Sequence, residues 1–81
     1  MAEVVDITRV WTIGPEPRPH FVKKMKAALE KQGQIEPLQV QPHENGYTLF
    51  SEDPWGNETV QAARELGWKT LLVVEMRRYE Q

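Results

Sequence analysis

The stretch "NETVQAARELGWKTLLVVEM", residues 57–76, encodes a helix, a stop and a strand in immediate succession. Small and apolar side chains recur in its first half with the helical spacing i, i+3, i+4 and i+7, at Thr59, Ala62, Ala63 and Leu66. Gly67 suits the left-handed conformation in which helices commonly end. The nearly continuous apolar run "KTLLVVEM", residues 69–76, then predicts a strand that is buried on both faces.

A second amphipathic helix is predicted upstream, between Pro19 and Gly33. Proline fits the first turn of a helix, where its missing N–H costs no hydrogen bond, and Gly33 fits the left-handed cap. One stripe of side chains has the spacing of a core-facing helix surface: Phe21, Met25, Ala28, Leu29 and Gln32. We therefore expect this stripe to face the core.

The remaining strands are predicted from alternation and turn residues. Residues 4–13 alternate between apolar and polar side chains, which predicts one half-buried strand. Its apolar face comprises Val5, Ile7, Trp11 and Ile13. The segments "PLQVQP" (37–42) and "YTLF" (47–50) predict a hairpin, with a tight turn at Asn45-Gly46 because both residues tolerate positive φ.

The element order is therefore β-α-β-β-α-β. It predicts an α+β fold class, with a small mixed β-sheet and two main helices in a single domain of residues 1–81. A hydrophobic content of 40% and a charged content of 27% are typical of globular domains. The pattern leaves open the oligomeric state, the strand that lies outermost, and whether the chain is a complete protein or an excised domain.

Composition excludes several kinds of chemistry. There is no cysteine, so disulfides, thiol nucleophiles and thiolate metal sites are all excluded. His20 and His43 lack a ligand spacing, and we expect neither a metal nor a cofactor. The net charge of −2 argues against indiscriminate coating of nucleic acid. The longest apolar run, residues 71–74, cannot cross a bilayer, and "MAEVVD" does not resemble a signal peptide, so we expect a cytoplasmic protein without membrane contact.

Several short segments follow one another in a distinctive order. A first strand leads to Arg18-Pro19 and to a helix with Val22, Met25 and Leu29. The segments "GQIEPLQVQP…GYTLF" and "AARELGWKTLLVVE" come next. In this order they resemble the ParB/sulfiredoxin-like domain family over nearly the whole chain. The resemblance implies the same α+β fold, with a working loop directly before the second helix.

By this resemblance, residues 56–59, "GNET", stand where family members bind nucleotides. ParB proteins carry a Gly-Glu-Arg-Arg box that binds the triphosphate of CTP, and sulfiredoxins carry a loop with a reactive cysteine that holds the phosphates of ATP. The resemblance makes four residues candidates for contact with nucleotide or phosphate: Arg18, Gly56, Asn57 and Thr59. Here, however, Glu58 and Thr59 replace the two arginines, and no basic residue is near in sequence. We therefore expect phosphate to be repelled.

Residues 57–58 also suit a purely structural function. Asn57 is predicted to be the N-cap of the second helix, because its side chain can accept a backbone hydrogen bond. Glu58 would then lie at the positive end of the helix dipole. On this interpretation "GNET" is a helix start that has replaced a catalytic loop.

Other groups of residues suggest alternative functions. The first helix is rich in lysines that could contact DNA, namely Lys23, Lys24, Lys26 and Lys31, although Glu30 and Glu36 interrupt them. Glu36 is the one candidate catalytic residue, because some members of the family use a carboxylate near this helix end in phosphoryl transfer. His20 could act as an acid or base, or be an exposed polar residue. The acids Glu52, Asp53 and Glu58 could bind Mg²⁺ but lack the spacing of a known loop, so we predict a solvated turn.

Trp55 is the most suggestive residue of the loop before the second helix. It lies between proline and glycine, and tryptophan is enriched at binding hot spots, although it could also pack as a lid. The candidates for protein contact are Glu52, Asp53, Trp55 and Glu58. The favoured hypothesis is a non-enzymatic binding module with an unidentified protein partner, a small regulatory or accessory factor of phage or plasmid type. The alternatives are a DNA-associated protein and a residual nuclease or nucleotide-dependent phosphotransferase.

Overall fold

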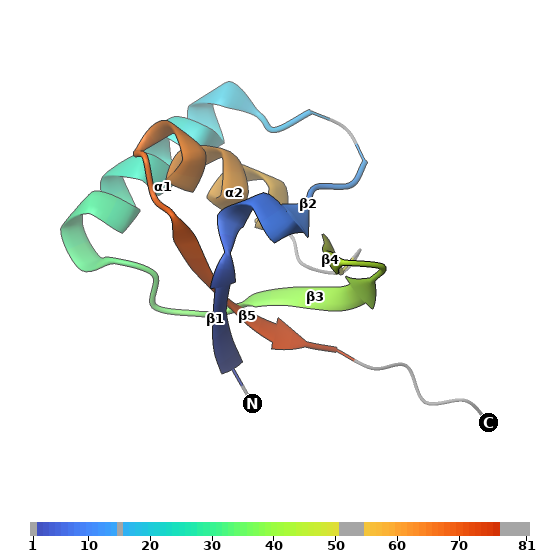
Figure 1. Ribbon diagram of the computed structural model, residues 1–81. Coiled ribbons are helices and arrows are strands. Elements are labelled where there is room, and N and C mark those ends of the chain that lie inside the picture. The colour runs from blue at the N-terminus through green and yellow to red at the C-terminus, as the bar shows by residue number, and fades with distance from the viewer. Residues whose placement is uncertain (1, 15, 51–54, 77–81) are drawn as a thin grey trace.

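The computed structural model describes residues 2–14, 16–50 and 55–76 of the 81-residue chain (Figure 1). Two α-helices, one 3₁₀ turn and five strands follow the predicted order, with one extra strand near the N-terminus. Their bounds are β1 Ala2–Asp6, η1 Ile7–Arg9, β2 Val10–Trp11, α1 Pro19–Gln32, β3 Leu38–His43, β4 Gly46–Leu49, α2 Gly56–Glu65 and β5 Thr70–Glu75. The predicted α+β class, with a small mixed sheet and two main helices, is confirmed.

All five strands belong to one mixed sheet in the order β1-β5-β3-β4-β2. β1 and β5 are antiparallel, β5 and β3 parallel, β3 and β4 antiparallel, and β4 and β2 parallel. The last strand in sequence is thus interior, and the two N-terminal strands form the edges. The sequence had left this order open.

The prediction of a single strand over residues 4–13 is wrong, because a 3₁₀ turn divides this segment into two strands. The carboxylate of Asp6 accepts hydrogen bonds from the Thr8 backbone N–H at 2.9 Å and from the Thr8 hydroxyl at 2.7 Å. These bonds lower the pKa of Asp6 and turn the chain into η1. An aspartate that bonds its local backbone competes with a strand ladder. As a result Val10 is fully buried, whereas Trp11 is left at the surface.

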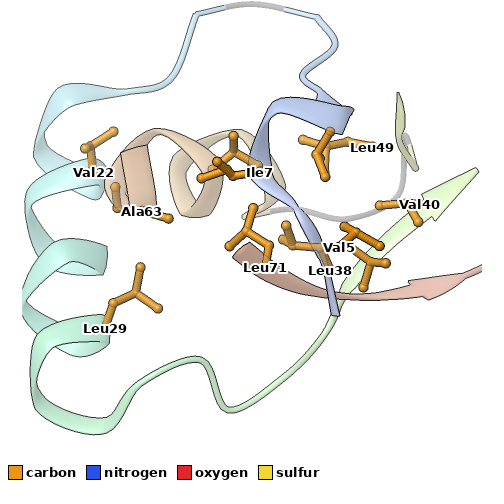
Figure 2. Packing of buried hydrophobic residues seen from close by; sticks show 13 residues of the cluster. Val5, Ile7, Val22, Leu29, Leu38, Val40, Leu49, Ala63 and Leu71 are labelled. Carbon is orange, nitrogen blue, oxygen red and sulfur yellow. The ribbon is translucent and has the colours of Figure 1, made fainter. Parts of the chain in front are cut away.

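The core lies between the sheet and the pair of helices (Figure 2). The buried apolar cluster contains Val5, Ile7, Val10, Val22, Leu29, Leu38, Val40, Leu49, Val60, Ala62, Ala63, Leu71 and Val73. On β5 only Leu71 and Val73 are fully buried, while Leu72 and Val74 are half-buried. The prediction that this strand is buried on both faces is therefore wrong, because the two helices lie together on one side of the sheet (Figure 1).

The buried face of α1 is rotated from the predicted stripe. Val22 and Leu29 are its buried residues, whereas Phe21 and Met25 are half-buried and Ala28 is exposed. α1 packs against α2, and this contact turns Val22 inward toward Ala63 (Figure 2). Phe21 is thereby moved to the rim of the core, where it becomes available for surface contacts.

The hairpin between β3 and β4 turns one residue earlier than predicted. Glu44 has the positive φ, 49°, and Gly46 is already paired with His43 in the ladder. Gly46 is required for a different reason, since a Cβ at this position would collide with the Arg9 backbone carbonyl. The Arg9 side chain fixes the same approach by donating from Nε to the Asn45 carbonyl at 2.8 Å.

Candidate functional site

The first turn of α2 is held without a conventional cap. The helix begins at Gly56, and Trp55 in the N-cap position makes no side-chain capping bond. Instead the Trp55 carbonyl accepts hydrogen bonds from the Thr59 N–H at 2.9 Å and from the Thr59 hydroxyl at 2.8 Å. The prediction of Asn57 as N-cap is wrong, since Asn57 lies inside the helix.

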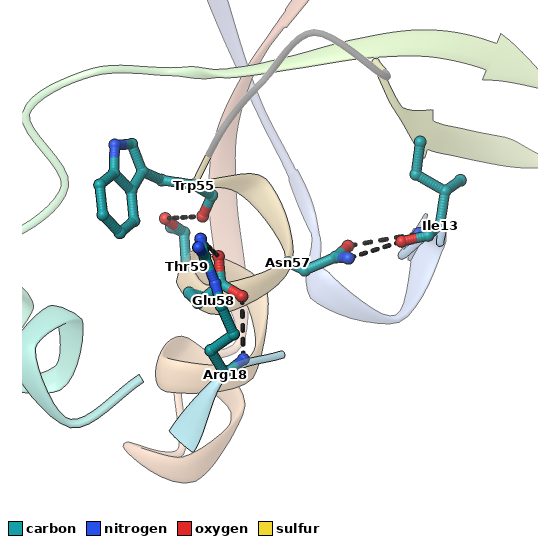
Figure 3. A network of polar contacts seen from close by, with 6 residues as sticks. All are labelled: Ile13, Arg18, Trp55, Asn57, Glu58 and Thr59. Carbon is teal, nitrogen blue, oxygen red and sulfur yellow. Dashed lines mark hydrogen bonds and ion pairs between the residues drawn. The ribbon is translucent and has the colours of Figure 1, made fainter. Parts of the chain in front are cut away.

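Asn57 fastens α2 to the chain that follows β2. Its amide oxygen accepts from the Ile13 N–H at 3.3 Å, and its amide nitrogen donates to the Ile13 carbonyl (Figure 3). A side-chain amide can donate one hydrogen bond and accept another, so it can satisfy both the N–H and the C=O of one residue, as a neighbouring strand would. Ile13 is therefore held although it lies beyond the end of β2.

Glu58 fastens the same helical turn to the start of α1. Its side chain is only 5% exposed, and Oε2 accepts from the Arg18 backbone N–H at 3.0 Å while Oε1 pairs with Arg18 Nη2 at 3.3 Å. Figure 3 shows Asn57 and Glu58 pointing apart, one to Ile13 and the other to Arg18. Two successive residues of α2 thus hold both ends of the segment between β2 and α1. We call Asn57 and Glu58 with these two partners the α2 clamp.

The electrostatics of the α2 clamp favour an ionised glutamate. Burial of the Glu58 carboxyl raises its pKa, but the two hydrogen bonds and the charge of Arg18 outweigh this effect and leave the pKa below its usual value. The carboxylate also lies in the first turn of α2, where the helix dipole favours negative charge. No basic residue is near Glu58 in sequence, but the fold brings Arg18 to it and offsets its charge.

Arg18 also joins an aromatic cluster on the surface. Its guanidinium carbon lies 4.2 Å from the centroid of the Phe21 ring and 5.5 Å from that of Trp55. Phe21 and Trp55 meet edge to face, with centroids 4.8 Å apart. The centroid of the His20 ring lies 4.1 Å from that of Phe21. A half-exposed arginine thus connects a buried carboxylate to two partly exposed aromatic rings.

Several solved structures have the same arrangement of helices and strands. Sulfiredoxin from Arabidopsis thaliana matches with a TM-score of 0.78 at 17% sequence identity, over 96% of this chain and 86% of that one. The C-terminally truncated chromosome-partitioning protein ParB from Caulobacter crescentus, complexed with CTP-γ-S, matches with a TM-score of 0.78 at 16% identity, over 99% of this chain and 46% of that truncated chain. This chain has the ParB/sulfiredoxin-like fold. SbnI from Staphylococcus aureus has a TM-score of 0.77 at 19% identity, over 94% and 30% of the two chains.

The likeness is one of fold alone at these identities. No protein-family model matches the sequence, and no curated protein is similar to it in sequence. The chain spans less than half the length of the ParB and SbnI chains that it matches. A second structure of the Caulobacter ParB contains the centromeric parS site. A shared fold does not by itself imply a shared function.

The lysines proposed for DNA contact lie on different sides of α1. Lys23 and Lys26 line a shallow groove between α1 and α2, together with three carboxylates, those of Glu16, Glu30 and Glu65. Lys26 forms an ion pair with Glu65 at 3.1 Å. Lys24 instead lies over the Phe21 ring at 5.9 Å, and Lys31 is in the last turn. The fold therefore intersperses this basic segment with acids.

The remaining candidates are spread over the molecule. Glu36 is exposed and lines a cleft between the end of α1 and β3, which Trp55 and Thr59 also line. Glu52 and Asp53 lie outside the described residues. Within residues 2–14, 16–50 and 55–76, no group of histidines, aspartates and glutamates is arranged to hold a metal ion. No helix in the described part of the chain is long and apolar enough to cross a membrane.

The sequence did not predict the pairing of Arg18 with Glu58 or the cluster of Arg18 with two aromatic rings. Glu58 and Trp55 come from a segment far in sequence from Arg18 and Phe21, so no local pattern brings them together. A signal was nevertheless present. The resemblance placed Arg18 near the box at residues 56–59, and an acid in that box next to an arginine indicates an ion pair.

Proposed function

We propose that this ParB/sulfiredoxin-like domain is a non-enzymatic binding module that acts through protein contact at the first turn of α2 and the start of α1. The observation that carries the proposal is the buried Glu58 carboxylate on Arg18. At the proposed site, the anion that pairs with Arg18 is the protein's own Glu58 carboxylate. The role as a small regulatory or accessory factor remains a prediction from the resemblance, as does its phage or plasmid origin.

Phosphate binding at this position would carry two costs. The Arg18 backbone N–H and one N–H of its guanidinium already donate to Glu58, so a phosphate oxygen that took these donors would displace a carboxylate. The displaced carboxylate would then remain buried beside a dianion. Removing one partner of a buried charge pair is strongly unfavourable. Both costs support a domain that does not use nucleotides.

The proposal is tested by two-dimensional amide NMR of the labelled protein with ATP and then CTP, each with Mg²⁺. We expect no shift changes at Arg18 or residues 56–59 in the wild-type protein. The variant Glu58→Gln releases the guanidinium, and Glu65→Gln makes the same charge change on the same helix outside the site. A larger nucleotide response in the Glu58 variant than in the Glu65 variant is expected. Saturable wild-type shifts at the α2 clamp would overturn the proposal.

DNA association is a second candidate, because ParB, which shares the fold, was solved with parS. The mixed charges around Lys23 and Lys26 make it the less supported of the two. If it holds, a short duplex at low salt will bind with an affinity that falls steeply with added salt. Replacing Lys23, Lys24 and Lys26 by glutamine would then abolish binding, and an undetectable complex with the wild-type protein would end this alternative.

Residual phosphotransfer or nuclease activity is the third alternative and depends on Glu36. Turnover of ATP or CTP that disappears in Glu36→Gln would support it. Turnover that survives this change would remove the role assigned to Glu36, and absence of turnover in the wild-type protein would remove the class.

A further inference from the structure

The aromatic cluster borders a small apolar pocket. The pocket has a volume of about 290 Å³ and is lined by Phe21, Lys24, Met25, Ala28 and Trp55. Ligand pockets usually have volumes of roughly 300–1,000 Å³. This one therefore suits a single large side chain rather than a whole cofactor. We call it the Trp55 pocket.

The walls of the Trp55 pocket are held in place before any partner arrives. The Trp55 carbonyl accepts two hydrogen bonds from Thr59, and its ring meets Phe21 edge to face. Arg18 lies against both rings and is itself held by Glu58. A partner would lose little free energy in ordering such walls, and this favours affinity.

Among the described residues, the charged side chain that lines the Trp55 pocket is cationic. Lys24 is in its lining, and the guanidinium of Arg18 lies on the same two rings. Among the described residues no carboxylate lines this pocket, and the Glu58 carboxylate, which pairs with Arg18, is buried. The partner complementary to an apolar pocket with a cationic rim carries a large apolar side chain flanked by acids.

A cleft lined by apolar and polar side chains, Glu36 among them, continues from the pocket along α1. The two share Met25, Ala28 and Trp55, and the cleft runs on toward Ile35, which is 69% exposed. An extended or helical segment of a partner has room to lie along this path, with its anchor side chain in the Trp55 pocket. Apolar anchors in grooves are a recurrent mode of peptide recognition.

We infer that the Trp55 pocket binds an acidic peptide segment of a partner protein through one large apolar anchor residue. This inference rests on the proposed function, because it names the class of partner for the same surface. Phe21, Trp55 and Lys24 are the specificity-determining residues. Composition supports it, since tryptophan and arginine dominate interface hot spots.

The test uses three synthetic peptides and amide NMR of the whole chain. The first peptide has a central tryptophan among glutamates and aspartates, the second replaces that tryptophan with glycine, and the third replaces every acid with lysine. We expect saturable shifts at Phe21, Lys24 and Trp55 with the first peptide. Affinity should fall about tenfold or more for each of the other two.

Matched variants locate the interaction. Lys24→Glu should weaken binding of the first peptide about tenfold or more, whereas Lys31→Glu makes the same charge change farther along α1 and should have little effect. Phe21→Ala should abolish anchoring, and the dispersion of its amide spectrum reports whether it is folded. Lys24→Glu concerns an exposed residue, so it keeps the inference testable if the Phe21 variant does not fold.

The outcomes separate this inference from the proposed function. No response to any peptide, or a stronger response to the lysine peptide, overturns the inference. Either result leaves the proposed function intact as long as nucleotides also fail to shift the α2 clamp. Nucleotide-dependent shifts at Arg18 and residues 56–59 would overturn the proposed function, whatever the peptides do.

Discussion

Two ion pairs tie the region of α1 to α2, and they differ in almost every physical respect. Arg18–Glu58 has a carboxylate that is 5% exposed and accepts a backbone hydrogen bond as well. Lys26–Glu65 has two side chains that are 36% and 40% exposed. Solvated pairs contribute little to stability because water and salt screen them, whereas a buried charge depends on its partner.

The difference shows what Glu58 does at the position where the resemblance places a nucleotide box. A glutamate at an exposed position would only add negative charge to the surface. The buried Glu58, beside Asn57, holds both ends of the segment between β2 and α1. Asn57 and Glu58, at the position where the resemblance places the box, thus have a structural task. The binding surface that we propose lies beside them, at Trp55 and Phe21.

Replacing Arg18 should have the largest effect on stability. Arg18→Ala leaves the Glu58 carboxylate with the backbone N–H alone, and we expect a loss of about 1–3 kcal/mol in the free energy of unfolding. Urea denaturation followed by tryptophan fluorescence measures it. Lys26→Ala is the matched control on the exposed pair. Equal losses in the two variants would contradict the distinction between the pairs.

Asn57 tests the other half of the α2 clamp. Asn57→Ala removes both hydrogen bonds to Ile13, and the expected loss is about 1–2 kcal/mol, because the contact is more exposed than that of Glu58. Hydrogen exchange of the Ile13 amide should speed up as well. Unchanged exchange at Ile13 would show that Asn57 does not hold the segment after β2 in solution.

The pH dependence of stability should separate Glu58 from the other acids. Its pKa is lower in the folded chain than in the unfolded chain, so the unfolded chain binds more protons in the acid range. The pair therefore contributes fully above the ordinary glutamate pKa, and its contribution falls as the pH drops through the folded pKa. The contribution of Glu58 is measured by denaturing wild type and Glu58→Gln between neutral and acid pH. The pKa values of Asp6 and Glu65 are also lowered, but both acids are present in both proteins, so their effects cancel in the difference. A constant difference at all pH values would argue against it.

The exposed pair should give the smallest effect. Lys26→Gln is expected to cost less than about 0.5 kcal/mol, and the cost should vanish in high salt. The Glu65 carboxylate keeps its hydrogen bond from Gln61 at 2.8 Å. A loss comparable to that of Arg18→Ala would mean that exposure does not decide how much each ion pair contributes to the free energy of unfolding.

Local patterns predicted the elements well. The end of α2 shows why, since Gly67 has the expected positive φ of 79° and the helical spacing of Thr59, Ala62 and Ala63 places all three inside. The break after β1 was missed because a single Asp6 side chain outcompetes the alternation around it. Helix α1 was predicted with its buried face rotated, because its packing against α2 is not encoded in its own periodicity.

The candidate site was predicted less completely than the fold. Trp55 and Glu58 were both identified, but as members of one exposed acidic loop. The structure buries Glu58 and leaves Trp55 43% exposed, because one faces Arg18 and the other faces Phe21. A segment about forty residues away supplies both of these partners, so no window of sequence around residue 58 contains the information.

The most direct test of the central claim is the pKa of the Glu58 carboxyl, measured by side-chain carbon NMR in the wild-type protein and in Arg18→Ala. We predict a wild-type pKa below that of an ordinary glutamate. In the variant the pKa should rise, because the guanidinium no longer opposes the effect of burial. A wild-type pKa at the ordinary value that does not respond to Arg18→Ala would contradict the claim that Glu58 fills the anion site.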